Sequence, residues 1–81
     1  MGKPLIYPNP FVDEVSISRN FPEDFTLVIT DLEGKMHFLH TYPGNQGKVM
    51  LEQLQAGTYI FKIISNGKSF EEKMIKIQNH K

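Results

Sequence analysis

Hydrophobic and polar residues alternate with a period of two along almost the whole chain. The alternation is plain in EVSIS at 14–18 and in FTLVIT at 25–30, and turn-forming residues interrupt it about every eight to twelve positions. Such spacing is typical of an antiparallel β-sandwich or β-barrel, and no segment has the pattern of a long amphipathic helix. The sequence therefore predicts an all-β fold of about seven strands, at roughly 4–7, 14–19, 24–31, 35–41, 48–52, 57–65 and 68–77.

Two glycine-containing connections support hairpins between these strands. Asn66-Gly67 is the strongest signal, because a type I′ turn requires a positive φ at both central residues. In DLEGK at 31–35, Gly34 is expected to take the left-handed position of a four- or five-residue connection. In the last strand the alternation changes phase between Phe70 and Lys73, which predicts a β-bulge there.

The stretch LQAGTYIFKI at 54–63 narrows the architecture. Gly57 lies two residues before Tyr59, at the start of the most apolar strand, where glycine lets the chain turn tightly. In immunoglobulin-like sandwiches a tyrosine at this place hydrogen-bonds to the upstream backbone and forms a tyrosine corner. We therefore predict an immunoglobulin-like antiparallel β-sandwich of about seven strands, with Tyr59 in such a corner.

The opening segment PLIYPNPF, at 4–11, is rigid and apolar. Pro8 and Pro10 have fixed φ angles and donate no backbone hydrogen bond, so the segment belongs at a sheet edge or in a loop that crosses the core. Tyr7 and Phe11 are expected to anchor it against the sandwich, with Phe11 buried.

Composition excludes several classes of function. The 81 residues suffice for one domain, expected at 4–81, with residues 1–3 as a start residue and a cloning remnant. Nine basic and nine acidic residues cancel, which argues against nucleic-acid binding and against a polybasic membrane patch. There is no cysteine for a disulfide or a thiolate metal site, and no apolar run is long enough to cross a bilayer.

Candidate catalytic chemistry is scarce. Glu71 and Glu72 are adjacent, so on a strand their carboxylates point to opposite faces and cannot act as an acid–base pair. His37 and His40, three positions apart, are likewise expected on opposite faces and without a third metal ligand. No serine stands in a nucleophile-elbow context, so neither an enzyme nor a cofactor is expected.

One metal alternative stays open in the DLEGK loop. Asp31 and Glu33, together with loop carbonyl groups, supply the oxygen ligands that calcium prefers, although a plain polar turn explains the same residues.

Four motifs, taken in order, resemble a known family. The segments YPNPF, ITDLEGK, LQAGTYIFKI and KMIKI are similar to those of the C-terminal sorting domains of proteins exported by the type IX secretion system of Bacteroidota. The resemblance covers residues 5 to 77. It implies a non-catalytic domain at the C-terminus of a larger secreted protein.

The resemblance also implies a route and partners. After Sec export, such a domain is recognised in the periplasm by outer-membrane components of the system, and its cargo crosses the outer membrane. A sorting peptidase then removes the domain and joins the cargo to anionic lipopolysaccharide. The expected localisation is therefore the periplasm in transit and then the cell surface or the medium, without insertion of the domain into a membrane.

The resemblance assigns roles to residues only through the matched motifs. The expected structural members belong to the opening and central motifs: Tyr7, Pro8, Asn9, Pro10, Phe11, Gly57 and Tyr59. The expected recognition residues belong to the closing motif: Lys73, Ile75, Lys76 and Ile77. The two lysines are the least explained by packing, and the last strand offers an edge that a partner strand can extend.

A competing interpretation is a stand-alone immunoglobulin-like interaction or carbohydrate-binding module of a secreted protein. Glycan platforms usually present exposed aromatic side chains, and this chain has no tryptophan. Phe21 and Tyr42, both in predicted loops, are the only rings expected to be exposed. A purely structural spacer is the third possibility.

Overall fold

The computed structural model describes residues 4–18 and 21–78, and these residues form strands and loops without any helix. The strands within this part of the chain are β1 (Ile6–Tyr7), β2 (Glu14–Ile17), β3 (Phe25–Asp31), β4 (Met36–Tyr42), β5 (Lys48–Met50), β6 (Gly57–Ser65) and β7 (Lys68–Lys76). The predicted all-β fold is confirmed. The cloning remnant expected at residues 1–3 lies outside the described residues.

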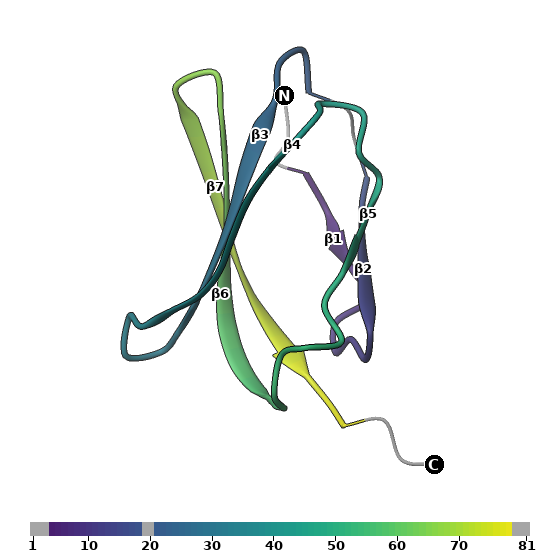
Figure 1. Cartoon of the computed structure of the whole chain (residues 1–81), viewed down its shortest axis with the longest axis vertical. Coiled ribbons are helices and arrows are strands. Elements are labelled where there is room, and N and C mark those ends of the chain that lie inside the picture. Colours follow the sequence, from purple (N-terminus) through teal and green to yellow (C-terminus); the bar gives the residue numbers. More distant parts are fainter. Residues whose placement is uncertain (1–3, 19–20, 79–81) are drawn as a thin grey trace.

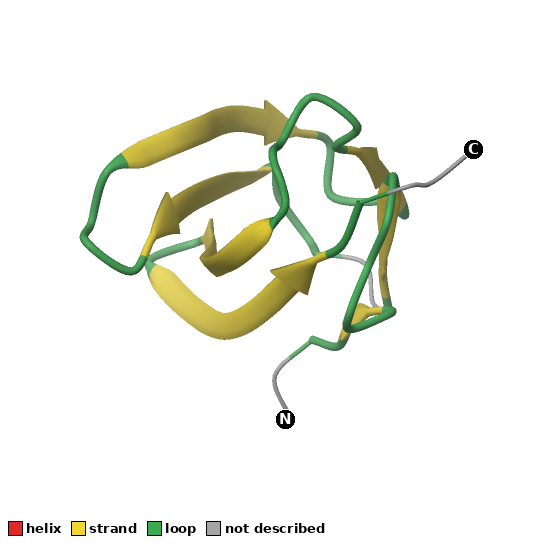
Figure 2. Cartoon of the chain, turned by 90° about the horizontal axis from the view of Figure 1, so that it is seen from below, coloured by secondary structure: helices red, strands yellow, loops and turns green. Residues whose placement is uncertain are grey.

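The strands form two antiparallel sheets that face each other (Figure 1). One sheet has the order β1-β2-β5 and the other the order β4-β3-β6-β7. Strand β4 lies beside β3, where variable-type immunoglobulin domains carry an additional edge strand. Viewed at 90° to Figure 1, the strands surround a common interior (Figure 2). The architecture is the predicted immunoglobulin-like sandwich.

The core follows directly from the alternation of residues along each strand. In the larger sheet Leu27 pairs with Ile63 and Ile29 pairs with Phe61, and all four side chains point inward because alternate residues share a face. The largest side chains with almost no exposed surface are Phe11, Phe25, Phe61, Leu27, Ile29, Leu51, Ile63, Met74, Val15 and Val49. Residues of both sheets and of the opening segment thus share one core.

The turn predictions are confirmed. Asn66 and Gly67 have φ angles of 52° and 76°, as a type I′ turn requires, and Gly34 has a φ of 90°.

The bulge predicted in the last strand is wrong. The β6–β7 register is continuous from Gly57 opposite Lys76 to Ser65 opposite Lys68. The apparent change of phase arises because the inward positions of β7 include a glutamate and a lysine, Glu72 and Lys76, besides apolar residues.

The register shifts instead between β3 and β4. Ile29 pairs with Phe38 but Thr30 pairs with Met36, which leaves His37 as the extra residue. Because of this extra residue, His37 and His40 point to the same face of the sheet although they are three positions apart. The prediction that they lie on opposite faces is therefore wrong. His37 packs against Tyr59, with 5.4 Å between ring centroids, and His40 packs against Tyr42 at 4.5 Å.

A close backbone contact holds the loop before β3. Phe21 N–H donates to the carbonyl oxygen of Gly44 at 2.8 Å. A Cβ atom on Gly44 would lie 2.1 Å from the Phe21 carbonyl oxygen, so the approach requires glycine. The Phe21 ring is buried and packs 5.1 Å from the ring of Phe25, so the prediction that Phe21 is exposed is wrong.

Candidate functional site

The opening motif and the last strand meet at one edge of the larger sheet. Phe11 forms an isolated parallel bridge with Lys76. Its N–H donates to the Ile75 carbonyl oxygen at 2.8 Å, and its carbonyl oxygen accepts from the Ile77 N–H at 2.9 Å. The backbone of Phe11 therefore acts as a one-residue strand beside β7.

The side chain of Asn9 continues this pairing by one step. Its Nδ2 donates to the Lys73 carbonyl oxygen, and its Oδ1 accepts from the Ile75 N–H, both at 3.0 Å. A primary amide offers the same donor and acceptor as a peptide group, so Asn9 takes the place of backbone in a segment whose neighbouring prolines lack an N–H. We call residues 9–11 the N-terminal clamp.

The clamp occupies the β7 edge. Four backbone groups point outward along residues 73–77, namely the Lys73 carbonyl, the N–H and carbonyl of Ile75, and the Ile77 N–H. The clamp pairs all four. The expectation that this part of the edge is unpaired is therefore wrong.

The two predicted anchors of the opening segment behave differently. Phe11 is fully buried, with its ring 5.5 Å from that of Phe61 in an edge-to-face arrangement, as predicted. Tyr7 is 49% exposed, so its predicted role as an anchor is wrong. The reason is the alternation within β1, where Ile6 is buried and Tyr7 must face outward. The Tyr7–Pro8 and Asn9–Pro10 peptide bonds are both cis.

Lys76 has a structural role that the sequence did not indicate. Only 5% of the residue is exposed. Its Nζ donates to the Val12 carbonyl oxygen and lies 5.9 Å from the centroid of the Phe11 ring, within reach of a cation–π contact. The expectation that packing does not explain Lys76 is therefore wrong, since this lysine joins β7 to the clamp.

The other predicted recognition residues face outward. Lys73 is exposed, and Ile75 and Ile77 retain 42% and 44% of their surface. The register places Lys73 and Ile75 on the outer face of the larger sheet. The exposed apolar side chains of the other strands on this face are Met36, Leu39 and Ile64.

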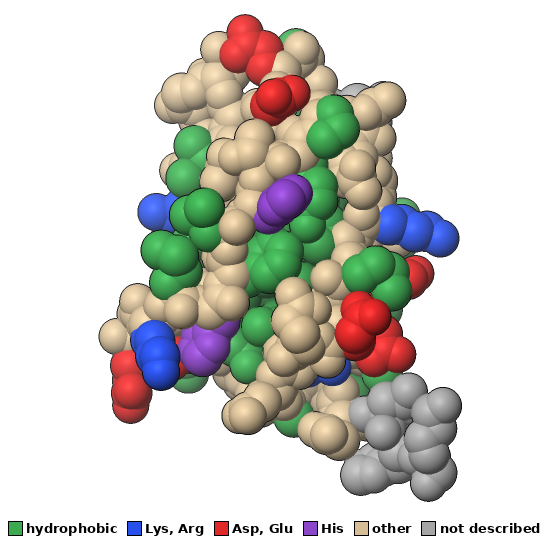
Figure 3. Space-filling view, in the orientation of Figure 1, with side chains coloured by type: hydrophobic (Ala, Val, Ile, Leu, Met, Phe, Trp, Pro, Cys, Tyr) green, Lys and Arg blue, Asp and Glu red, His purple; other side chains and the backbone are tan. Residues whose placement is uncertain are grey.

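A hollow of about 190 Å³ on this outer face is lined by side chains of β3, β6 and β7. It lies between Val28, Ile60 and Ile64 and is bordered by the Lys62–Glu71 ion pair, whose atoms are 3.8 Å apart. Figure 3 shows hydrophobic side chains along the outer side of the larger sheet as well as between the sheets.

The predicted tyrosine corner is present. Tyr59 is buried, and its hydroxyl donates to the Gln55 carbonyl oxygen at 2.7 Å. Gly57 has a φ of 158°, and the atoms nearest to a Cβ built there belong to the Tyr59 ring, at 3.8 Å. The corner thus joins the start of β6 to the loop before it.

Asp31 organises the connection between β3 and β4. Its Oδ1 accepts from the Glu33 N–H at 2.9 Å and from the Lys35 N–H at 3.0 Å, and its Oδ2 lies 2.9 Å from His37 Nε2. The hydrogen bond with His37, helped by that from Lys35, lowers the pKa of Asp31. Both carboxylate oxygens of Asp31 are therefore used by hydrogen bonds within the turn, and a calcium site in this loop would need the same oxygens.

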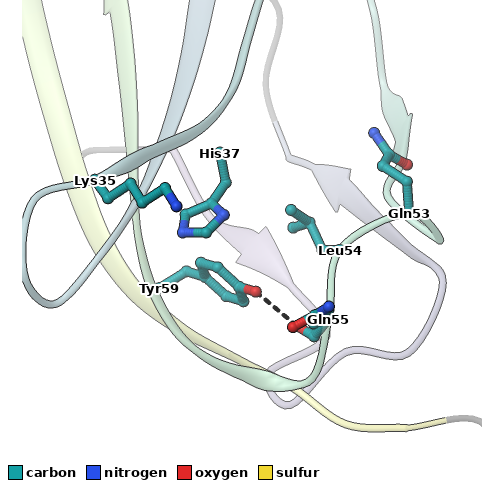
Figure 4. Close-up of a pocket in the computed structure, with 6 residues that line it drawn as sticks. All are labelled: Lys35, His37, Gln53, Leu54, Gln55 and Tyr59. Atoms are coloured by element: carbon teal, nitrogen blue, oxygen red, sulfur yellow. Dashed lines mark hydrogen bonds between the residues drawn. The ribbon is translucent and has the colours of Figure 1, made fainter.

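A pocket of about 330 Å³ lies next to this turn (Figure 4). Its lining consists of Lys35, His37, Gln53, Leu54, Gln55 and Tyr59. The lining side chains can donate and accept hydrogen bonds, but they include no serine, cysteine or carboxylate. The carboxylate beside His37 is that of Asp31, which the turn already uses. Among the described residues, no group of three or more His, Cys, Asp or Glu side chains is arranged to hold a metal ion.

The rings expected to serve a glycan platform do not form one. Tyr42 is partly buried against Phe25, 5.6 Å between ring centroids, and burial raises the pKa of the Tyr42 hydroxyl. Phe21, whose ring lies 5.1 Å from that of Phe25, belongs to the core. In the part of the chain that the structure describes, there is also no helix of the length and hydrophobicity that a membrane span needs.

Fold and site together define a small immunoglobulin-like sandwich in which the first and last motifs form one unit, with an apolar outer face beside it. The family model of the secretion system C-terminal sorting domain matches residues 5–78. The chain belongs to this family, as its motifs indicated. A search of curated proteins finds no match.

Membership in the family establishes the general function. The domain is a C-terminal sorting signal for type IX secretion, and it acts through the machinery of that system. Domains of this family are generally non-catalytic, and the protein that carries one is destined for the cell surface or the extracellular space. The interpretation as a stand-alone interaction or carbohydrate-binding module is not favoured.

Proposed function

We propose that outer-membrane components of the type IX machinery recognise this domain in the periplasm through the outer face of its larger sheet. In this proposal the domain guides a larger cargo protein across the outer membrane, and a sorting peptidase of the system then removes it. Lys73, Ile75 and Ile77 supply the recognition contacts. Lys76 contributes indirectly, because it holds their strand against the opening motif.

The observation that carries the proposal is the division of the closing motif between two faces. Met74 and Lys76 are buried, whereas Lys73, Ile75 and Ile77 are exposed. Single exposed apolar residues are common on protein surfaces and need no explanation.

The surroundings of these residues make the outer face unusual. On the same face, the exposed apolar side chains of Met36, Leu39 and Ile64 extend the apolar surface across the sheet. An exposed patch of apolar residues that is surrounded by polar residues is typical of protein interaction sites. An interface of this kind suits a receptor that must bind many cargo proteins through the one domain they share.

A secretion assay with matched variants tests the proposal. Residues 4–81 are fused behind a fluorescent reporter with a Sec signal and expressed in a host that has the type IX system. Two substitutions alter the outer face, Lys73→Glu and Ile75→Ser. Two controls change similarly exposed residues elsewhere, Lys68→Glu at the start of β7 and Met50→Ser on the smaller sheet.

The outer-face variants should leave the reporter in the periplasm, whereas the controls should export it like the unaltered domain. Thermal unfolding of each purified domain verifies that the variants remain folded. Unaltered export of the reporter by folded Lys73→Glu and Ile75→Ser variants would refute the proposed surface.

A further inference from the structure

We propose that the outer edge of β4 binds the same edge of a second copy of the domain, so that the two larger sheets join into one. Strands β4 and β7 are the two outer strands of the larger sheet. The clamp pairs the end of β7, whereas β4 is paired with β3 on one side only within the described residues. This pairing of two copies does not depend on the recognition contacts proposed above.

Backbone alternation identifies the groups of β4 that point away from the sheet. The Asp31 N–H donates to the Lys35 carbonyl oxygen, so the β3 residue two positions earlier, which pairs with Phe38, also points its backbone toward β4. Phe38 and every second residue after it therefore pair with β3, and the backbone groups of Leu39 and Thr41 point outward. In the part of the chain that the structure describes, no hydrogen bond pairs these outward groups.

The composition of β4 leaves this edge open to pairing. Exposed edge strands are usually protected by charged side chains, by proline or by their short length. Strand β7 contains lysine and glutamate residues, β5 has three residues and includes Lys48, and β1 has two residues and is followed by Pro8. Strand β4 has seven residues, MHFLHTY, and none of them is charged in the manner of Asp, Glu, Lys or Arg, or is proline. The bulge at His37 leaves residues 38–42 as its regular part.

A second copy of β4 matches this edge residue by residue. In an antiparallel pair with its two-fold axis at His40, Leu39 of each copy lies opposite Thr41 of the other, and all the outward groups of both residues form hydrogen bonds. Phe38 of each copy then lies opposite Tyr42 of the other, which gives two cross-strand aromatic pairs. Because the strand contains no Asp, Glu, Lys or Arg, the two copies meet without a pair of like charges from these residues.

The inner side of β4 has room for the side chains of a second copy. Phe38 and Tyr42 are only partly buried and His40 is exposed, although all three lie on the side that faces the smaller sheet. The smaller sheet therefore does not cover β4 completely, and Figure 3 shows hydrophobic side chains exposed between the sheets. Pairing of Phe38 with Tyr42 of the other copy covers these rings further.

Joining the two sheets also brings their outer faces together. The two-fold axis at His40 is perpendicular to the joined sheet, so both outer faces lie on the same side. The exposed side chains of Met36 and Leu39 lie next to the junction. A paired domain therefore presents one apolar surface with two sets of the residues Lys73 and Ile75.

Sedimentation of the full chain provides the first test. The average mass should rise with protein concentration from 9.3 kDa toward twice that value. His40→Glu places two carboxylates opposite each other at the two-fold axis and should weaken the dimer at least about tenfold. Met50→Glu changes an exposed strand residue of the smaller sheet and should dimerise like the unaltered domain. Thermal unfolding verifies that both variants remain folded.

Disulfide cross-linking provides the second test, because the chain has no cysteine of its own. Residues that face each other in a non-hydrogen-bonded antiparallel pair have Cα atoms about 4.5 Å apart, which a disulfide can span. The His40→Cys variant should therefore form a cross-linked dimer when it is oxidised with diamide. Leu39→Cys is the matched control, since the two copies of residue 39 lie diagonally at about 7–8 Å, beyond the usual span of a disulfide.

The outcomes decide between this edge and any other contact. Loss of the dimer in His40→Glu, together with cross-linking at residue 40 but not at residue 39, would support the proposal. A chain that stays monomeric at millimolar concentration would overturn it and leave the β4 edge to a strand of a different protein. A dimer that persists in folded His40→Glu, or equal cross-linking at residues 39 and 40, would also overturn it. None of these results depends on how the outer-face variants are exported.

Discussion

Replacing Phe11 with alanine tests whether the opening motif is a structural member of the sandwich. The Phe11 side chain has no exposed surface, and its ring packs edge-to-face with Phe61 at 5.5 Å. Replacement of a buried phenylalanine by alanine costs about 3–5 kcal/mol in free energy of unfolding. We expect about 4 kcal/mol here, because Phe61 and Lys76 belong to a paired sheet and cannot close the cavity.

This loss is large for so small a domain. Stability of about 0.05–0.15 kcal/mol per residue corresponds to about 4–12 kcal/mol for the whole chain. The Phe11→Ala variant should therefore be partly unfolded at 37 °C or close to it. Phe11→Leu, which leaves a smaller cavity, should lose about half as much.

Urea denaturation followed by far-ultraviolet circular dichroism measures these changes, since the chain has no tryptophan. Tyr7→Ala serves as the matched control, because Tyr7 belongs to the same motif but is 49% exposed. Its free energy of unfolding should change by less than about 1 kcal/mol. Equal losses in Phe11→Ala and Tyr7→Ala, or no loss beyond error in Phe11→Ala, would refute the assignment of Phe11 to the core.

Three further substitutions test other parts of the sandwich. Gly44→Ala should destabilise the domain by about 2 kcal/mol, because the new Cβ would lie 2.1 Å from the Phe21 carbonyl oxygen. Gly47→Ala is the control and should be nearly neutral, because no atom lies within 4 Å of a Cβ there. Similar denaturation midpoints for the two variants would contradict this reasoning. Tyr59→Phe should cost about 1 kcal/mol through the lost corner hydrogen bond, and an unchanged midpoint would argue against that bond. The lowered pKa of Asp31 stabilises the fold above the ordinary carboxyl pKa of 3.8 and this contribution is lost as the pH falls. The stability difference between the unaltered domain and Asp31→Asn should therefore shrink below about pH 4, and a constant difference would disprove the coupling.

Features set by neighbouring residues were predictable from the sequence. Alternation placed Leu27, Ile29 and Phe61 in the core, because residues two apart on a strand share a face. The turn at Asn66-Gly67 and the corner at Tyr59 were predictable for the same reason, since each depends on a few consecutive residues.

Features set by distant partners were not predictable in this way. A lysine in a strand is usually a surface residue, and the burial of Lys76 depends on its acceptor, the Val12 carbonyl, 64 positions earlier in the chain. The role of Asn9 depends on backbone groups of residues 73 and 75. Phe21 lies in a predicted loop, but its backbone pairs with Gly44 and its ring is buried against Phe25. The one available hint was chemical: between two prolines, a side-chain amide is the natural substitute for missing backbone donors.

The clamp also links the order of synthesis to the completion of the fold. The Asn9 side chain pairs with residues 64 and 66 positions later in the chain, and the Phe11 backbone pairs with residues 75 and 77. Neither contact can form before these residues have been made. A chain that breaks off before Lys73 keeps most of its core residues but cannot pair its opening motif. Contacts of such long sequence separation form late, because the intervening chain must be ordered first. The clamp can therefore pair only in a chain that has been made through β7, and a chain that ends before Lys73 leaves its opening motif unpaired.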